Sequence, residues 1–244
     1  MKLTQIIMGM PVSVEVVGDD SEANINDVFN YFKAVDARYS TYKEDSEISQ
    51  INRGLPDSQW SEEMKDVLKL CEETKRISNG YFDIEKDGKK DPSGLVKGWA
   101  INNAAKLLKE KGIKDFYIEA GGDIEISGLN SEGEPWSVGI RNPFNVDEII
   151  KVIRLNKGGI ATSGTYIRGE HIYDPKSSFS APSGIKSLSV IGPDIYEADR
   201  FATAAYAMGR NGISFIAALP GFEGYMVDDQ QQAIYTEGFA NYVI

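Results

Sequence analysis

The single histidine of this chain, His171, lies in the segment RGEHIYDP at residues 168–175. An imidazole has a pKa near 6.5, so it can accept a proton at neutral pH and act as a general base. Arg168, Tyr173 and Asp174 give the segment further polar groups. A lone histidine is nevertheless more often a surface or core side chain than a catalyst. The segment alone therefore leaves both interpretations open.

Two oxygen-bearing side chains in the segment EADRFATAAYAMG have a spacing that suits a metal ion. Asp199 and Thr203 are four residues apart, which places them on one face of a helix. With one histidine and one cysteine in the chain, a metal would have to be held mainly by oxygen, which favours Mg²⁺. The alternative is that Asp199 stabilises the start of the helix and Thr203 lies on its surface.

The segment DPSGLVKGWA, residues 91–100, has the features of an anion site. Asp91 and Ser93 precede a predicted helix start, where free backbone N–H groups favour anions. Gly94 allows a close backbone approach, and Lys97 lies one turn further, within reach of a phosphate or a carbonyl oxygen. The alternative is a capped helix with a solvated lysine. The glycines of EAGGDIEI (119–126) similarly indicate either a turn that faces a ligand or a plain hairpin connection.

Composition excludes several classes of function. The net charge is −11 and no basic stripe is present, so we expect no nucleic-acid partner. No apolar run approaches the roughly 20 residues of a membrane span. Dinucleotide-fold, P-loop and G-x-S-x-G motifs are absent. Because the first residues read as a strand rather than a signal peptide, we expect a cytoplasmic protein; an apolar leader upstream of Met1 would instead make it an exported lipoprotein.

Periodicity predicts an α+β fold in a single domain over residues 1–244. Helices are expected at residues 21–40, 61–78, 95–112 and 197–209, and one strand within residues 6–17. Further strands are expected at residues 115–120, 123–128, 136–141, 149–155, 166–174 and 185–192. Ser, Pro and Gly predict an exposed loop at residues 177–184.

Eight segments in order resemble the FAD:protein FMN transferase (ApbE) family. They are MGMPVSVEV, YSTYKEDSEISQIN, SNGYFDI, DPSGLVKGWA, AGGD, TSGTYIR, HIYDP and EADRFATAAYAMG, between Met8 and Gly209. The resemblance implies an ApbE-like, T-fold-related structure of mixed sheets flanked by helices, with the active site in a cleft between two subdomains.

The resemblance also implies a reaction and its residues. Family members transfer FMN from FAD to a Ser or Thr hydroxyl of a target flavoprotein and release AMP, and the target site resembles D-x-x-[ST]-G-A-[ST]. His171 matches the proposed catalytic base, and Asp199, Thr203 and the Gly94 carbonyl match the Mg²⁺ ligands. The residues that match the FAD-binding positions are Met8, Tyr42, Tyr81, Phe82, Asp83, Asp91, Lys97 and Ile172.

The chain departs from the family pattern at three places. Met10 occupies a position where a threonine is common, residues 176–184 (KSSFSAPSG) are an insertion, and the stretch from Phe82 to Asp91 is short. Two other functions use the same residues: an FAD pyrophosphatase, with water as the nucleophile, and a flavin-binding protein without chemistry. The second would be favoured by loss of the metal ligands or of His171, all of which are present.

Overall fold

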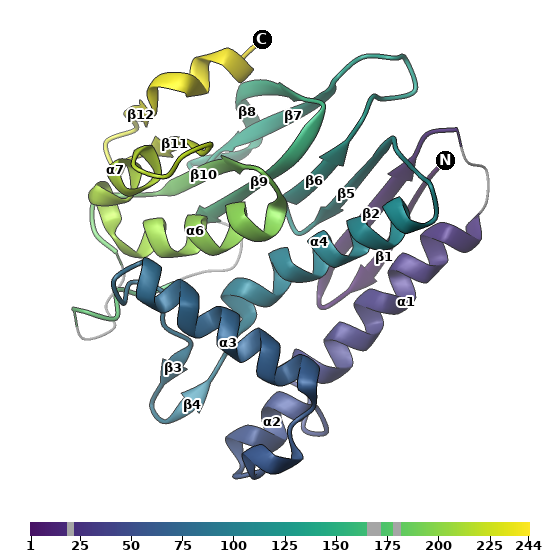
Figure 1. Cartoon of the computed structure of the whole chain (residues 1–244). Coiled ribbons are helices and arrows are strands. Elements are labelled where there is room, and N and C mark those ends of the chain that lie inside the picture. Colours follow the sequence, from purple (N-terminus) through teal and green to yellow (C-terminus); the bar gives the residue numbers. More distant parts are fainter. Residues whose placement is uncertain (19–21, 165–171, 178–181) are drawn as a thin grey trace.

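A computed structural model describes residues 1–18, 22–164, 172–177 and 182–244. An eight-stranded sheet forms its centre, and every strand pairing among these residues is antiparallel, where mixed sheets were expected. The spatial order is β1 (Lys2–Ile7), β2 (Met10–Val16), β5 (Phe116–Ala120), β6 (Asp123–Ser127), β9 (Lys157–Gly164), β10 (Ser187–Gly192), β11 (Glu223–Val227) and β12 (Ala233–Tyr235). The α+β class is confirmed (Figure 1).

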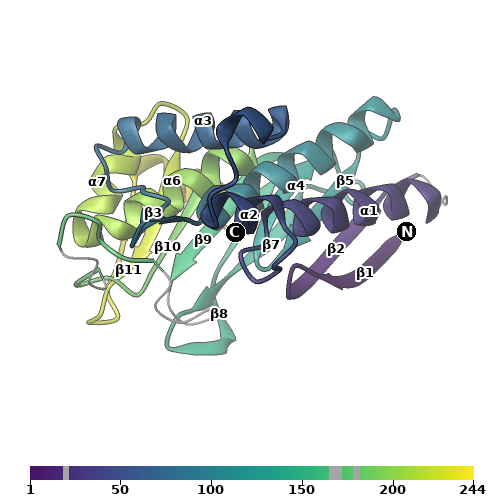
Figure 2. The ribbon, with the colours of Figure 1, turned by 90° about the horizontal axis from the view of Figure 1, so that it is seen from below.

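Helices cover one face of this sheet. Three long helices, α1 (Glu22–Tyr39), α4 (Ser93–Glu110) and α6 (Ile195–Ala207), lie across it, with α4 between the other two (Figures 1 and 2). The elements between α1 and α4 are α2 (Glu47–Asn52), η1 (Asp57–Gln59), α3 (Glu62–Ile77), β3 (Glu85–Lys86) and β4 (Lys89–Lys90), and those directly after α6 are η2 (Gly209–Asn211) and α7 (Gly212–Ala217). None of the helices within the described ranges has the length and apolar character that a membrane span requires.

A second apolar core lies on the opposite face of the sheet. There the hairpin of β7 (Trp136–Asn142) and β8 (Asn145–Leu155) and the short helix η3 (Glu237–Tyr242) cover the strands. Ile124, Ile126 and Ile160 face this second core, whereas Ala161 belongs to the core beneath the helices. The sheet is thus buried on both faces in its middle strands.

The strand predicted within residues 6–17 is present as β2 (Met10–Val16), but its first residues, Ile6 and Ile7, belong to a separate strand, β1. Met8 and Gly9 both have positive φ angles, 56° and 72°, and form a two-residue turn between β1 and β2. Turns of this kind match the twist of a hairpin, and a glycine at the second position is typical. A continuous alternation of side chains hid the turn in the sequence.

The four predicted helices are confirmed within two residues at each described end. Ser61 accepts a hydrogen bond from the Met64 backbone N–H and caps α3, and Gly112 follows α4 with a φ of 82°. The strand predicted over residues 166–174 mostly lies outside the described residues. In its described part, Ile172 and Tyr173 have no regular secondary structure and Asp174 forms only an isolated β-bridge, so a strand over residues 172–174 is wrong.

Strand β6 places two acids under the helices. Because Ile124 and Ile126 face the second core, the alternation of the strand directs Asp123 and Glu125 to the helix-covered face. Both acids are buried. Glu125 Oε2 accepts a hydrogen bond of 2.8 Å from the Ile195 backbone N–H, at the start of α6.

Burial raises the pKa of the Glu125 carboxyl to about 7 from its ordinary 4.5. The unfolded chain loses this proton near pH 4.5, whereas the folded protein keeps it up to about pH 7. The free energy of unfolding therefore falls as the pH rises from 4.5 to about 7. Glu125→Gln keeps the acceptor but removes the charge. We expect the variant to exceed the wild type in unfolding free energy by about 1–3 kcal/mol at pH 8.

Urea unfolding of both proteins at pH 5 and pH 8 measures this difference. At pH 5 the advantage of the glutamine should shrink, because the glutamate is then protonated in the fold. The exposed Glu110, replaced by glutamine, serves as the control and should show no such trend. An advantage that is equal at both pH values would contradict the assignment.

Candidate active site

A pocket of about 120 Å³ lies where the first turns of α4 meet α6. Its walls come from the turn after α3, the start of α4, the end of β9, the segment after residue 171, and α6. The lining residues are Tyr81, Phe82, Asp83, Ile84, Asp91, Ser93, Gly94, Lys97, Gly121, Thr162, Ser163, Gly164, Ile172, Tyr173, Pro175, Asp199 and Thr203. Six of the eight predicted FAD-binding residues and all three predicted metal ligands are among them.

The predicted metal ligands meet where α4 and α6 cross. Thr203 Oγ1 donates a hydrogen bond of 3.3 Å to the Gly94 carbonyl oxygen. Asp199 Oδ2 accepts one of 2.8 Å from the Gly98 backbone N–H. A Cβ at Gly98 would lie 2.6 Å from Asp199 Cβ, so only glycine allows the two helices to approach this closely. The geometry therefore gathers oxygens from residues 94, 199 and 203 in one place.

Lys97 lies between two buried carboxylates. Its ammonium forms an ion pair with Asp123 Oδ2 and lies 3.5 Å from Asp199 Oδ1. The Asp199 side chain is 4% exposed. Burial raises the pKa of the Asp199 carboxyl, the Lys97 ammonium opposes this rise, and the neighbouring Asp123 adds to it. A carboxylate kept out of water in this way is stabilised in its charged form by any positive charge that comes close to it.

The donor set fits a hard cation. A carboxylate, a hydroxyl and a backbone carbonyl are the oxygen ligands that Mg²⁺ accepts. The described residues contain no group of three His, Cys, Asp or Glu side chains that could hold a metal, so Asp199 would be the one charged ligand in this set. The shortage of carboxylates agrees with a site completed by substrate oxygens or water, as is usual for Mg²⁺.

Polar contacts fix the turn after α3. The Ser78 hydroxyl accepts a hydrogen bond of 2.9 Å from the Phe82 N–H, and Lys75 Nζ lies 2.8 Å from Asp83 Oδ2. The Tyr173 hydroxyl donates to the Asp83 carbonyl at 3.1 Å, which ties the turn to the segment that follows His171. Two stretches of chain far apart in sequence are thereby held against one pocket.

A second, larger cavity of about 610 Å³ adjoins the first, because Asp91 and Tyr173 line both. Tyr42 lies on its wall and is 97% exposed. Its other lining residues are Thr41, Glu44, Ser49, Asn52, Arg53, Lys86, Asp87, Lys89 and Lys90. The structure thus places Tyr42 beside the pocket rather than in it.

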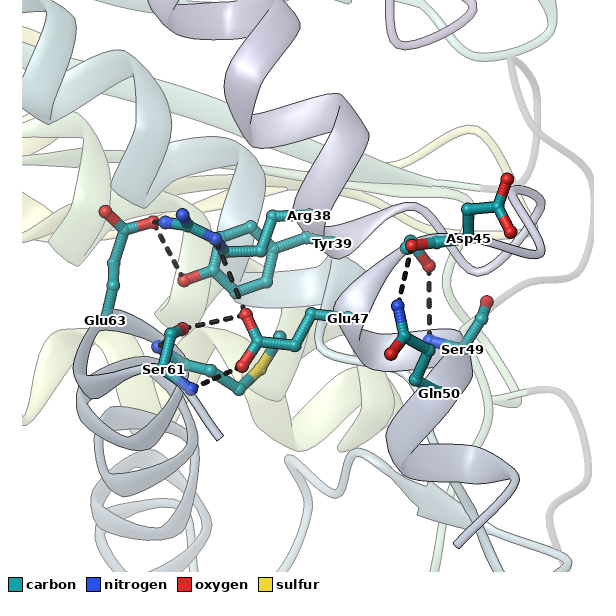
Figure 3. A network of polar contacts seen from close by, with 10 residues as sticks. Arg38, Tyr39, Asp45, Glu47, Ser49, Gln50, Ser61 and Glu63 are labelled. Atoms are coloured by element: carbon teal, nitrogen blue, oxygen red, sulfur yellow. Dashed lines mark hydrogen bonds and ion pairs between the residues drawn. The ribbon is translucent and has the colours of Figure 1, made fainter. Parts of the chain in front are cut away.

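A polar network joins the helices α1, α2 and α3 (Figure 3). Glu47, at the start of α2, accepts hydrogen bonds from the Ser61 backbone N–H at 2.6 Å and the Ser61 hydroxyl at 2.7 Å. Arg38, near the end of α1, forms an ion pair with Glu63 and lies 3.5 Å from Glu47. The contact between Arg38 and Glu47 links the two helices that flank residues 40–46, the segment that contains Tyr42.

Of the described residues predicted to bind FAD, Met8 is the one that lines neither cavity. It occupies the turn between β1 and β2 and is half-buried. His171 lies outside the described residues, although Ile172, Tyr173 and Pro175 line the first pocket. Its role as a base stays a prediction.

Sequence reasoning missed Asp123 as a site residue. AGGD was recognised as a segment, but its acid was not assigned a contact. The alternation in DIEI also fits a strand whose acids face solvent, so the sequence did not show that Asp123 is buried. In the fold the acid is buried, and Lys97 supplies the partner that a buried acid requires.

Comparisons with known proteins agree with the geometry. The FAD:protein FMN transferase of Haemophilus influenzae is 24% identical over 290 residues, covering 90% of this chain and 84% of that protein. The Escherichia coli K12 protein of the same name is 28% identical over 155 residues, covering 60% of this chain but 44% of its own length.

Solved structures share the fold. The ApbE protein of Thermotoga maritima superimposes with a TM-score of 0.87 at 22% identity, covering 99% of this chain and 98% of that chain. The flavin transferase ApbE of Vibrio cholerae gives the same TM-score, identity and coverage. The sequence profile of the ApbE family matches residues 8–89 and 85–226. With nearly the whole chain matched in this way, the protein belongs to the ApbE family.

Proposed function

We propose that this protein is a Mg²⁺-dependent FAD:protein FMN transferase. In this reaction FMN passes from FAD to a Ser or Thr hydroxyl of a target flavoprotein, and AMP is released. The transferase class is supported by the family and by relatives that carry this name. We further propose that the acceptor site has the form D-x-x-[ST]-G-A-[ST].

One observation carries the proposal: a buried carboxylate, a hydroxyl and a backbone carbonyl meet beside a lysine. Asp199, Thr203 and the Gly94 carbonyl would hold the divalent cation. When bound, such a cation neutralises charge on phosphate oxygens. Lys97 offers a second positive charge at the same pocket, which explains how an acidic protein can bind a pyrophosphate.

The size of the two cavities supports a dinucleotide substrate. Cofactor sites usually measure about 300–1,000 Å³. The first pocket, of about 120 Å³, is too small for FAD by itself, but it adjoins the cavity of about 610 Å³ at Asp91 and Tyr173, which line both. We infer that the pyrophosphate lies near Lys97 and that a ring system extends past Tyr173 towards Tyr42.

The chain's own residues then account for the transfer. The acceptor oxygen attacks the phosphorus of the FMN half, and the bond from that phosphorus to the oxygen of the AMP half breaks. His171 accepts the hydroxyl proton, and AMP leaves with the bridging oxygen. The product is a phosphoester between FMN and the acceptor side chain. Lys97 stabilises negative charge on the phosphate oxygens as it develops.

AMP release tests this function against its alternatives. The protein is incubated with FAD and Mg²⁺, with and without an acceptor protein, and AMP is measured by chromatography. We expect AMP in proportion to acceptor. AMP and free FMN at the same rate without acceptor would identify a pyrophosphatase, and FAD binding without AMP would identify a carrier.

Tyr42 gives a prediction about binding. An exposed aromatic ring can stack on a flat polarizable ligand, which is worth about 0.5–1.5 kcal/mol. Tyr42→Ala should therefore weaken FAD binding about 3- to 10-fold and change the maximal rate less. Flavin fluorescence titration measures the affinity. Tyr235, exposed on β12 and outside both cavities, is the matched control. An unchanged Kd in Tyr42→Ala would contradict the placement.

A further inference from the structure

We propose that Asp123 is a positioning residue that holds the Lys97 ammonium away from Asp199 and so leaves Asp199 open to the divalent cation. The inference rests on the proposed function, because it takes Asp199 as a cation ligand. It concerns the state before FAD binds, when no phosphate is present to attract the lysine.

The carboxylate of Asp123 is held in one place by burial and by a backbone hydrogen bond. It is the first residue of β6 and is 1% exposed. Its Oδ1 accepts a hydrogen bond of 3.1 Å from the Thr162 backbone N–H on the neighbouring part of the sheet, and its Oδ2 pairs with Lys97. The backbone contact fixes the carboxylate, so its second oxygen has a defined place for the ammonium.

Lys97 is shared unequally between two carboxylates. Its side chain is 14% exposed, and Nζ is closer to Asp123 Oδ2 than to Asp199 Oδ1, from which it is 3.5 Å away. Asp199 Oδ2 is already bonded to the Gly98 N–H. Asp199 Oδ1 is therefore the oxygen for which an ammonium and a divalent cation would compete.

Loss of the Asp123 charge should change that competition. A buried ammonium requires a counter-charge, and Asp199 is the other carboxylate within reach among the described residues. Lys97 would move onto Asp199 Oδ1, since attraction between charges grows as their distance falls. Asp123 thus acts on the cation site through the lysine and without touching the cation.

The experiment is a double-mutant cycle on cation affinity in the absence of FAD. Mn²⁺ is the probe, and its binding is measured by electron paramagnetic resonance in the wild type, Asp123→Asn, Lys97→Met and the double variant. Asparagine keeps the acceptor for the Thr162 N–H, and thermal unfolding checks the fold. We expect Asp123→Asn to weaken Mn²⁺ binding about 10-fold or more, and the double variant to bind within about 3-fold of Lys97→Met.

The other outcomes overturn the inference. If Asp123→Asn weakens binding equally with and without the Lys97→Met substitution, Asp123 acts through its own charge or as a ligand. Unchanged Mn²⁺ affinity in both backgrounds would mean that Asp123 does not keep the Lys97 ammonium away from Asp199. Asp123→Glu, which retains the ion-pairing charge, should bind Mn²⁺ like the wild type and guards against a fold defect in the asparagine variant. Absence of Mn²⁺ binding in the wild type without FAD would overturn the inference, and absence of binding with FAD present as well would refute the cation site of the proposed function itself.

Discussion

Asp199→Asn should reduce FMN transfer by about 10³-fold or more while the protein remains folded. A bound metal ion contributes several kcal/mol to the stabilisation of charge in a phosphoryl-type transfer, and the variant removes the one charged side chain of the proposed site. The asparagine oxygen can still accept the hydrogen bond from the Gly98 N–H. Because burial raises the pKa of the Asp199 carboxyl, removing its charge should not lower thermal stability.

Activity and thermal unfolding are measured on the same preparations. Thr203→Val is the graded comparison, since it removes a neutral ligand of the same site and should cost less activity than Asp199→Asn. EDTA treatment of the wild type should reproduce the loss, and added Mg²⁺ should reverse it. Full activity in Asp199→Asn or after EDTA would contradict the need for a divalent cation in the transfer reaction.

His171→Asn should reduce transfer by about 10²–10⁴-fold with nearly normal binding of FAD and Mg²⁺. Asparagine keeps a hydrogen-bonding group but cannot take the hydroxyl proton, and a positioned general base is usually worth that factor. The wild-type rate should rise with pH through the titration of an imidazole near pH 6.5, and the residual rate of the variant should lack this rise.

Binding and rate separate the possible roles of His171. Affinity for FAD by fluorescence and the pH dependence of transfer are measured for both proteins. Lost FAD affinity would make the histidine a ligand contact. Unchanged transfer would make it structural, and Asp174, three residues further on, would be the next candidate for the base.

Local pattern was sufficient to predict the elements that carry the site. The spacing of Asp199 and Thr203 on one helix, and of Gly94 and Lys97 at the start of another, depends on periodicity alone. Both helices are present, and their residues line one pocket. That these two helices lie side by side was implied by the family resemblance alone, because no single segment of the sequence contains this information.

Contacts between distant segments could not be predicted from local pattern. The approach of Gly98 to Asp199 joins residues 101 positions apart, and the ion pair of Lys97 with Asp123 crosses from a helix to a strand. Whether a side chain lines a cavity also depends on the tertiary structure. Tyr42 and Met8 both match FAD-binding positions, but of these two only Tyr42 lies on a cavity wall. The turn at Met8 was missed because the apolar alternation continues through it.

The mass of an acceptor protein shows directly whether FMN is transferred to it. A protein with a D-x-x-[ST]-G-A-[ST] site is incubated with this enzyme, FAD and Mg²⁺, and its intact mass is recorded beside that of an acceptor whose receiving Ser or Thr is replaced by alanine. We expect a mass gain of one FMN less one water on the intact site, none on the alanine variant, and one AMP released per flavin attached. An unmodified acceptor, with FAD consumed or not, would contradict the proposed transfer.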